Sequence, residues 1–140
     1  MCLAVYIASD SQLPLVGWDE NKPSLHVAEL NREYDEKVRV QFSKPFVYYV
    51  GSHTNCGCGF AFSGFIKDEE NMTETSQSMK QLSNYLSEVT QKYGMIELYV
   101  CWEGDQSEKP EYTGEISASE VKDMNFQFQE RQLLEVKHYV

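Results

Sequence analysis

One segment of the sequence carries residue types that could do chemistry. It reads Ser-His-Thr-Asn-Cys-Gly-Cys-Gly from residue 52 to residue 59 and places His53, Cys56 and Cys58 within six positions. An imidazole and two thiols can bind a transition metal, and a thiolate can also act as a nucleophile. The two glycines free the backbone from Cβ restrictions, so the chain can curl and turn the three side chains toward one point. This segment is therefore the candidate functional site.

Metal binding is the first hypothesis for His53, Cys56 and Cys58. They would supply three of the four tetrahedral ligands that zinc prefers, and the fourth would come from Cys101, Cys2, a carboxylate or water. A water in that position would leave the metal open for catalysis. The cysteines are separated by one residue, whereas zinc sites typically separate them by two. The expected cofactor is zinc or another transition metal.

Thiol chemistry is the second hypothesis, with Cys56 or Cys58 as a catalytic nucleophile or redox-active residue. His53 and the backbone N–H groups of the loop would favour the thiolate, and the second cysteine could resolve an oxidised intermediate. A disulfide between the two would close a small, strained ring that is easily reduced. Since the segment lacks the two-residue spacing of thioredoxin-type motifs, the sequence leaves open whether the protein is an enzyme.

The third hypothesis is a tight turn with buried structural cysteines in a non-catalytic ligand-binding or protein-binding domain. A histidine at a strand end can hydrogen-bond the backbone, and free cysteines are often small buried hydrophobic residues. Cys2 and Cys101 lie in apolar segments and are interpreted as core residues. His26 has no visible partner in the sequence, and Trp18 and Tyr49 are interpreted as core aromatics rather than walls of a pocket.

The candidate site must be positioned by strands and one helix. Segments rich in β-branched or aromatic residues predict strands at Leu3 to Ala8, Leu25 to Leu30, Val38 to Phe42, Phe46 to Val50 and Phe60 to Phe65. The apolar run from residue 95 to 102 predicts an interior strand, and Phe126, Phe128 and residues 134–140 predict further strand. The charged residues 103–111 predict a loop, and Ser117 with Glu120 predicts the start of a short helix.

The pattern of apolar residues between positions 73 and 93 predicts the main helix. Met79, Leu82, Leu86, Val89 and Tyr93 recur at spacings of three and four, which is the apolar stripe of an amphipathic helix. Because the sequence has no internal repeat and no long linker, we expect residues 1–140 to form a single α+β domain. Its mixed or antiparallel sheet would carry the main helix on one face.

Composition and charge narrow the classes of partner. The chain has 140 residues and a formal net charge of −10, and its basic residues are scattered, which disfavours binding to nucleic acid or to an anionic membrane. The apolar start lacks the charged region of a secretory signal, so we expect a cytoplasmic protein with reduced thiols. Exposed strand edges and abundant tyrosine leave room for a homodimer.

Overall fold

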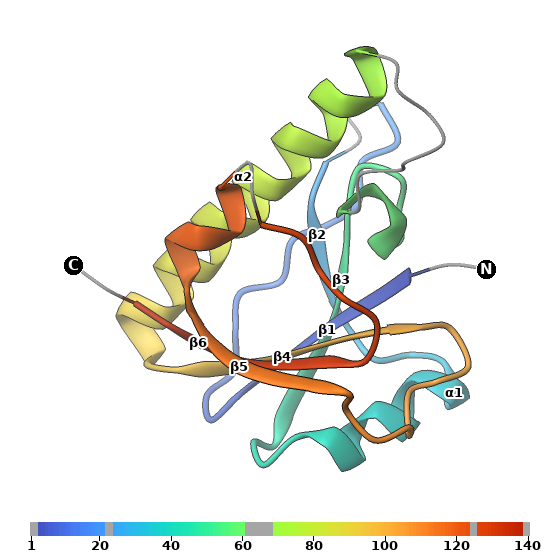
Figure 1. Ribbon diagram of the computed structural model, residues 1–140, viewed down its shortest axis with the longest axis vertical. Coiled ribbons are helices and arrows are strands. Elements are labelled where there is room, and N and C mark those ends of the chain that lie inside the picture. Colours follow the sequence, from blue (N-terminus) through green and yellow to red (C-terminus); the bar gives the residue numbers. More distant parts are fainter. Residues whose placement is uncertain (1–2, 22–23, 61–68, 124–125, 139–140) are drawn as a thin grey trace.

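The computed structural model describes residues 3–21, 24–60, 69–123 and 126–138, and six strands in these ranges form one sheet (Figure 1). The strands are β1 (Leu3–Ser9), β2 (His26–Glu29), β3 (Phe46–Gly51), β4 (Ile96–Trp102), β5 (Tyr112–Ser117) and β6 (Gln132–Lys137). Their order across the sheet is β2-β3-β1-β4-β6-β5. β5 runs parallel to β6, and the other neighbouring strands are antiparallel. The predicted α+β fold with a mixed sheet is confirmed.

β1 lies in the middle of the sheet, and both of its faces are buried. Successive side chains of a strand point to opposite faces. Val5 and Ile7 belong to the larger core cluster together with residues of the main helix, whereas Ala4 and Tyr6 belong to a second cluster. The sheet therefore has two buried faces and needs a covering element on each side.

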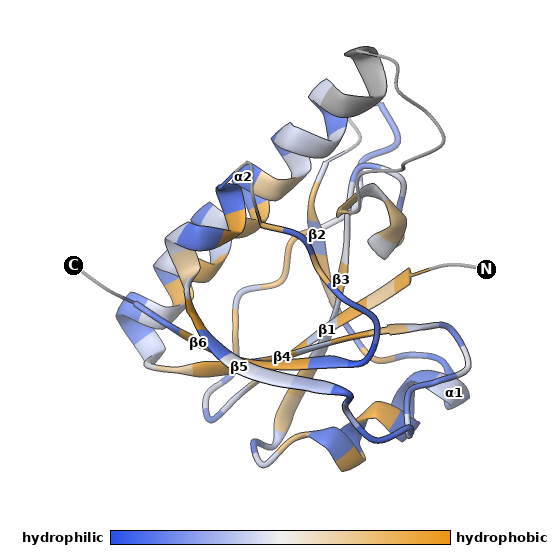
Figure 2. Ribbon diagram, in the orientation of Figure 1, coloured by the Kyte–Doolittle hydropathy of each residue, from blue (hydrophilic) through white to orange (hydrophobic). Residues whose placement is uncertain are grey.

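The main helix, α2 (Glu69–Tyr93), covers the first face (Figure 1). Met79, Leu82, Leu86 and Val89 are buried in the larger cluster, which confirms the predicted apolar stripe. Figure 2 shows that the helix also carries many hydrophilic residues, as expected of an amphipathic helix. Gly94 ends α2 with a φ of 91°. Among the described residues, no helix has the length and apolar content needed to cross a membrane.

The second face is covered by α1 (Glu33–Glu36) and the 3-10 helix η1 (Lys37–Gln41). This finding corrects the predicted strand over residues 38–42. Val38 is fully buried in the second cluster, but Val40 is 71% exposed, so the two valines do not share a strand face. The helical turn of α1 continues directly into η1, and the β-branched residues in this segment did not override it.

Three further segments differ from the sequence-based predictions. The 3-10 helix η2 (Gly57–Phe60) occupies the start of the predicted strand 60–65, and residues 61–65 lie outside the described residues. β5 was not predicted because most of its side chains are exposed, so its pattern resembles a loop. Phe126 and Phe128 lie outside the strands. Their rings pack edge to face, with their centroids 5.0 Å apart. The short helix predicted to start at Ser117, by contrast, is present as the 3-10 helix η3 (Ala118–Lys122), with Ser117 as its N-cap.

Candidate functional site

The cysteine loop, residues 52–60, begins with a tight turn directly after β3. The backbone N–H and the hydroxyl of Ser52 both donate to the carbonyl of Cys56, at 2.8 and 2.7 Å. Asn55, at the tip, has a φ of 67°, a left-handed conformation that asparagine tolerates better than most residues. These two hydrogen bonds from Ser52 close the turn.

The glycines of the cysteine loop permit close packing. A Cβ at Gly57 would lie 2.5 Å from the carbonyl oxygen of Leu3 in β1. A Cβ at Gly59 would lie 2.1 Å from the hydroxyl oxygen of Ser52. Both distances are far below van der Waals contact, so the loop can lie against β1 and fold on itself only with glycine at these positions.

Gly57→Ala should lower the free energy of unfolding by about 1–3 kcal/mol, because the added methyl group would displace the backbone of β1. Gly17→Ala is the matched control, since no atom of the described residues lies within 4 Å of a Cβ at Gly17. Urea denaturation of both variants measures the difference. Equal stabilities would contradict the close approach of the loop to β1.

The His53 side chain faces α2. Its Nδ1 lies 2.6 Å from the hydroxyl oxygen of Ser78, which also accepts the His53 backbone N–H at 3.3 Å. Its Nε2 lies 3.4 Å from a carboxylate oxygen of Glu74. Both ring nitrogens therefore contact residues of α2, and these contacts hold the cysteine loop against the helix.

The two cysteines of the loop contact other partners. The Sγ of Cys58 accepts the backbone N–H of Leu3 at 3.2 Å, and the side chain packs against the larger core cluster. The Sγ of Cys56 lies 3.4 Å from the hydroxyl of Thr54. Cys56 also lies near enough to Tyr49 to contribute, after burial, to the raised pKa of that phenol.

His53, Cys56 and Cys58 thus have different neighbours. Among the described residues, no group of three or more His, Cys, Asp and Glu side chains is arranged to hold a metal ion. Metal binding by these three residues would require His53 to leave its contacts with Ser78 and Glu74 on α2. The metal-binding hypothesis and the thiol-chemistry hypothesis both stay predictions. Near-stoichiometric zinc in protein purified without chelator, lost in His53→Ala, would support the first.

The remaining cysteines are placed as follows. Cys101 is fully buried in β4, within the second cluster, and burial raises the pKa of its thiol to about 12. It is therefore a protonated core residue, as predicted. Cys58 packs against the cluster on the other face of the sheet, so Cys101 does not lie beside it. Cys2 lies outside the described residues.

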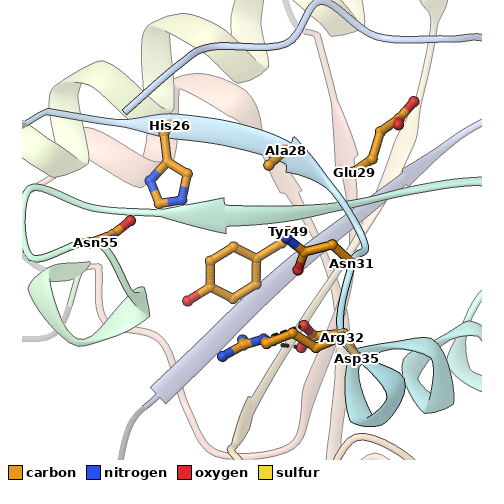
Figure 3. A pocket seen from close by; sticks show the side chains of 8 residues that line it. All are labelled: His26, Ala28, Glu29, Asn31, Arg32, Asp35, Tyr49 and Asn55. Carbon is orange, nitrogen blue, oxygen red and sulfur yellow. Dashed lines mark hydrogen bonds and ion pairs between the residues drawn. The ribbon is translucent and has the colours of Figure 1, made fainter. Parts of the chain in front are cut away.

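A pocket of about 240 Å³ opens on the sheet face opposite α2 (Figure 3). We call it the His26 pocket, and it is lined by His26, Ala28, Glu29, Asn31, Arg32, Asp35, Tyr49 and Asn55. In the sheet His26 pairs with Gly51, and Ala28 with Tyr49. In Figure 3 the Tyr49 ring lies between the His26 ring and the Arg32 side chain. The tip of the cysteine loop, Asn55, closes one side of this pocket.

His26 is the least expected member of the pocket. It is 7% exposed, and its Nδ1 has no hydrogen-bond partner among the described residues. The ring covers Gly51, where a Cβ would lie 1.8 Å from its Cε1, and its centroid lies 5.6 Å from that of Trp18 and 5.8 Å from that of Tyr49. Burial lowers the pKa of His26, so the imidazole is neutral near neutral pH.

Arg32 forms the opposite wall of the pocket and is held by a buried network. Its Nε donates to Asp35 at 2.7 Å, and its guanidinium lies over the rings of Tyr34 and Tyr49, 4.4 and 5.4 Å from their centroids. Asp35 is 1% exposed and also accepts the hydroxyl of Tyr6. Because Asp35 contacts Nε and Nη2, the Nη1 of Arg32 lies outside this ion pair.

An apolar groove of about 370 Å³ adjoins the His26 pocket, and we call it the Trp18 groove. It shares His26, Ala28, Glu29 and Asn55 with the pocket and adds Leu15, Val16, Gly17, Trp18 and Val27. Val16 and Val27 exchange two backbone hydrogen bonds at the outer edge of β2. Trp18 was interpreted as a core residue, but it is only half-buried and lines this groove.

Comparison with protein-family models, with curated proteins and with solved structures finds no match for this chain. The function of this chain is therefore inferred from the geometry of the His26 pocket, the Trp18 groove and the cysteine loop.

Proposed function

We propose that this chain is a ligand-binding domain whose site is the His26 pocket. The observation that carries the proposal is that His26, which lines this pocket, is a buried imidazole whose Nδ1 has no hydrogen-bond partner among the described residues. A buried polar atom without a hydrogen bond costs about 1–3 kcal/mol. The protein carries this cost in the wall of a pocket, which favours a binding role for the His26 ring over a purely structural one.

The arrangement around His26 also supports binding. Arg32 is held on two aromatic rings and by Asp35, so its orientation is fixed before a ligand arrives. A fixed side chain loses little conformational freedom on binding. A concave site with aromatic walls and a few convergent polar groups is typical of small-molecule sites.

The contacts of the cysteine loop favour a binding role over thiol or metal chemistry. Cys58 accepts a backbone hydrogen bond from β1, and His53 fastens the loop to α2. These roles hold the loop in place, and the loop in turn presents Asn55 to the pocket. The third sequence-based hypothesis, a binding domain with structural cysteines, is the one that these contacts support.

The proposal is tested with a set of uncharged heteroaromatic and amide fragments, screened by ¹H–¹⁵N NMR. Fragments that bind should shift the amide signals of Ala28, Tyr49 and Asn55 around the His26 pocket. His26→Phe keeps an aromatic ring over Gly51 but removes both nitrogens, so fragment affinity should fall by about tenfold or more. The free energy of unfolding should stay the same or rise, because the unpartnered nitrogen is gone.

Tyr112→Phe provides the matched control, since it is an aromatic exchange on β5 at the other edge of the sheet. Fragment affinities of this variant should equal those of the unmodified protein. If no fragment shifts the signals of the pocket, or if His26→Phe binds fragments as well as the control does, the proposal is wrong.

A further inference from the structure

If the proposed binding function is correct, the His26 pocket and the Trp18 groove together also indicate the chemical class of the ligand. We propose that they bind an uncharged, planar nitrogen heterocycle of purine type that carries an apolar substituent. The heterocycle would occupy the His26 pocket, and the substituent would lie in the Trp18 groove. Charge, hydrogen-bonding capacity and the apolar lining each support one part of this description.

The charges around the pocket favour an uncharged ligand. The cation of Arg32 is matched by Asp35 at 2.7 Å and approached by Glu103 at 3.8 Å, and the whole chain carries a formal charge of −10. A phosphate or carboxylate would therefore meet a guanidinium already neutralised within an acidic field. A cationic ligand would compete for the Tyr49 ring with the Arg32 guanidinium that lies over it.

The pocket walls suit a flat molecule with both donors and acceptors on its edge. The neutral imidazole of His26 has one donor and one acceptor nitrogen, and the amides of Asn31 and Asn55 each offer both functions. The rings of His26 and Trp18 line the pocket and the adjoining groove and provide aromatic surface against which a flat ring can pack. Nitrogen heterocycles such as purines combine a π-face with alternating donors and acceptors.

The Trp18 groove offers an apolar surface to the substituent. It continues from the pocket past His26, and Leu15, Val16 and Trp18 line its far side. Leu15 is 57% exposed, so an apolar group that lay against it would remove apolar surface from water. A ligand that filled both spaces would gain hydrogen bonds in one and hydrophobic contact in the other.

The test uses adenine, N6-benzyladenine and adenosine 5′-monophosphate, titrated by NMR with the unmodified protein. N6-benzyladenine should bind at least about tenfold tighter than adenine, because its phenyl ring is buried along Trp18. The monophosphate should bind more weakly than adenine because its charge meets the acidic field. Equal or tighter binding of the monophosphate would overturn the inference.

Trp18→Ala should lower the affinity for N6-benzyladenine by a much larger factor than the affinity for adenine, so that most of the roughly tenfold difference between the two ligands is lost. Leu15→Ser, at an exposed position, provides a second variant with a smaller effect in the same direction, should the tryptophan variant fold poorly. Unchanged affinity for N6-benzyladenine in a folded Trp18→Ala protein would also overturn the inference. If other fragments bind at His26 but none of these purines does, the ligand class is wrong and the proposed binding function stands. If no fragment binds, both fail.

Discussion

Val38→Asp should unfold the domain or lower its free energy of unfolding by about 4 kcal/mol or more, because it places an unpaired carboxylate in the core. Val38, a residue of η1, is fully buried in the second cluster together with the sheet residues Tyr6 and Tyr99. Val40→Asp, two residues further along the chain, should change the free energy of unfolding by less than about 0.5 kcal/mol, since Val40 is 71% exposed.

Urea denaturation followed by circular dichroism measures both effects. This pair of variants also distinguishes the 3-10 helix from the strand that the sequence predicts for residues 38–42. In a strand, Val38 and Val40 would share one face, so both changes would be costly or both harmless. Similar losses of stability for the two variants would therefore contradict the observed η1.

The fold could be predicted where its apolar pattern is long and regular. The stripe from Met79 to Tyr93 spans several helical turns, and the run from residue 95 to 102 is nearly continuous, so both elements were predicted at nearly the correct boundaries. Short segments behaved differently. Two valines separated by one residue fit a strand as well as a helical turn, and the preceding turn of α1 decided between them.

β5 shows the opposite failure. Its first four residues are exposed, and it includes Gly114, so nothing in the local pattern distinguishes it from the charged loop before it. It becomes a strand by pairing in parallel with β6, which follows later in the chain. Pairing of this kind depends on tertiary contacts that a local reading of the sequence does not include.

The cysteine loop, which the sequence predicts as the candidate site, lies beside the His26 pocket and contributes Asn55 to its lining. His26 had no local partner, because its neighbours Trp18, Tyr49 and Gly51 are brought to it by the β2–β3 pairing and the loop before β2. One local signal was available for the opposite wall. Arg32 and Asp35 are opposite charges three residues apart, a spacing that favours an ion pair on a helical turn.

Breaking the ion pair between Arg32 and Asp35 is expected to have the second large effect on stability. Arg32→Met should lower the free energy of unfolding by about 3 kcal/mol, because removing one partner of a pair leaves the other charge buried without its cation. Asp35 is only 1% exposed. In this variant its carboxylate would keep the hydrogen bond from the Tyr6 hydroxyl but lose the ion pair with the Arg32 guanidinium. Methionine retains much of the apolar contact of the arginine stem with the rings of Tyr34 and Tyr49, so the loss reports mainly on charge.

Two further variants isolate the charge. In Arg32→Met/Asp35→Asn the buried charge is absent and the amide oxygen can still accept the Tyr6 hydroxyl, so stability should return to within about 1 kcal/mol of the unmodified protein. Arg39→Met breaks the ion pair with Glu36, in which both side chains are exposed. This change should lower the free energy of unfolding by less than about 1 kcal/mol. If Arg32→Met costs no more than Arg39→Met, the buried carboxylate does not depend on Arg32. The arginine of the pocket would then be free to move, and the fixed orientation on which the proposed binding site relies would be lost.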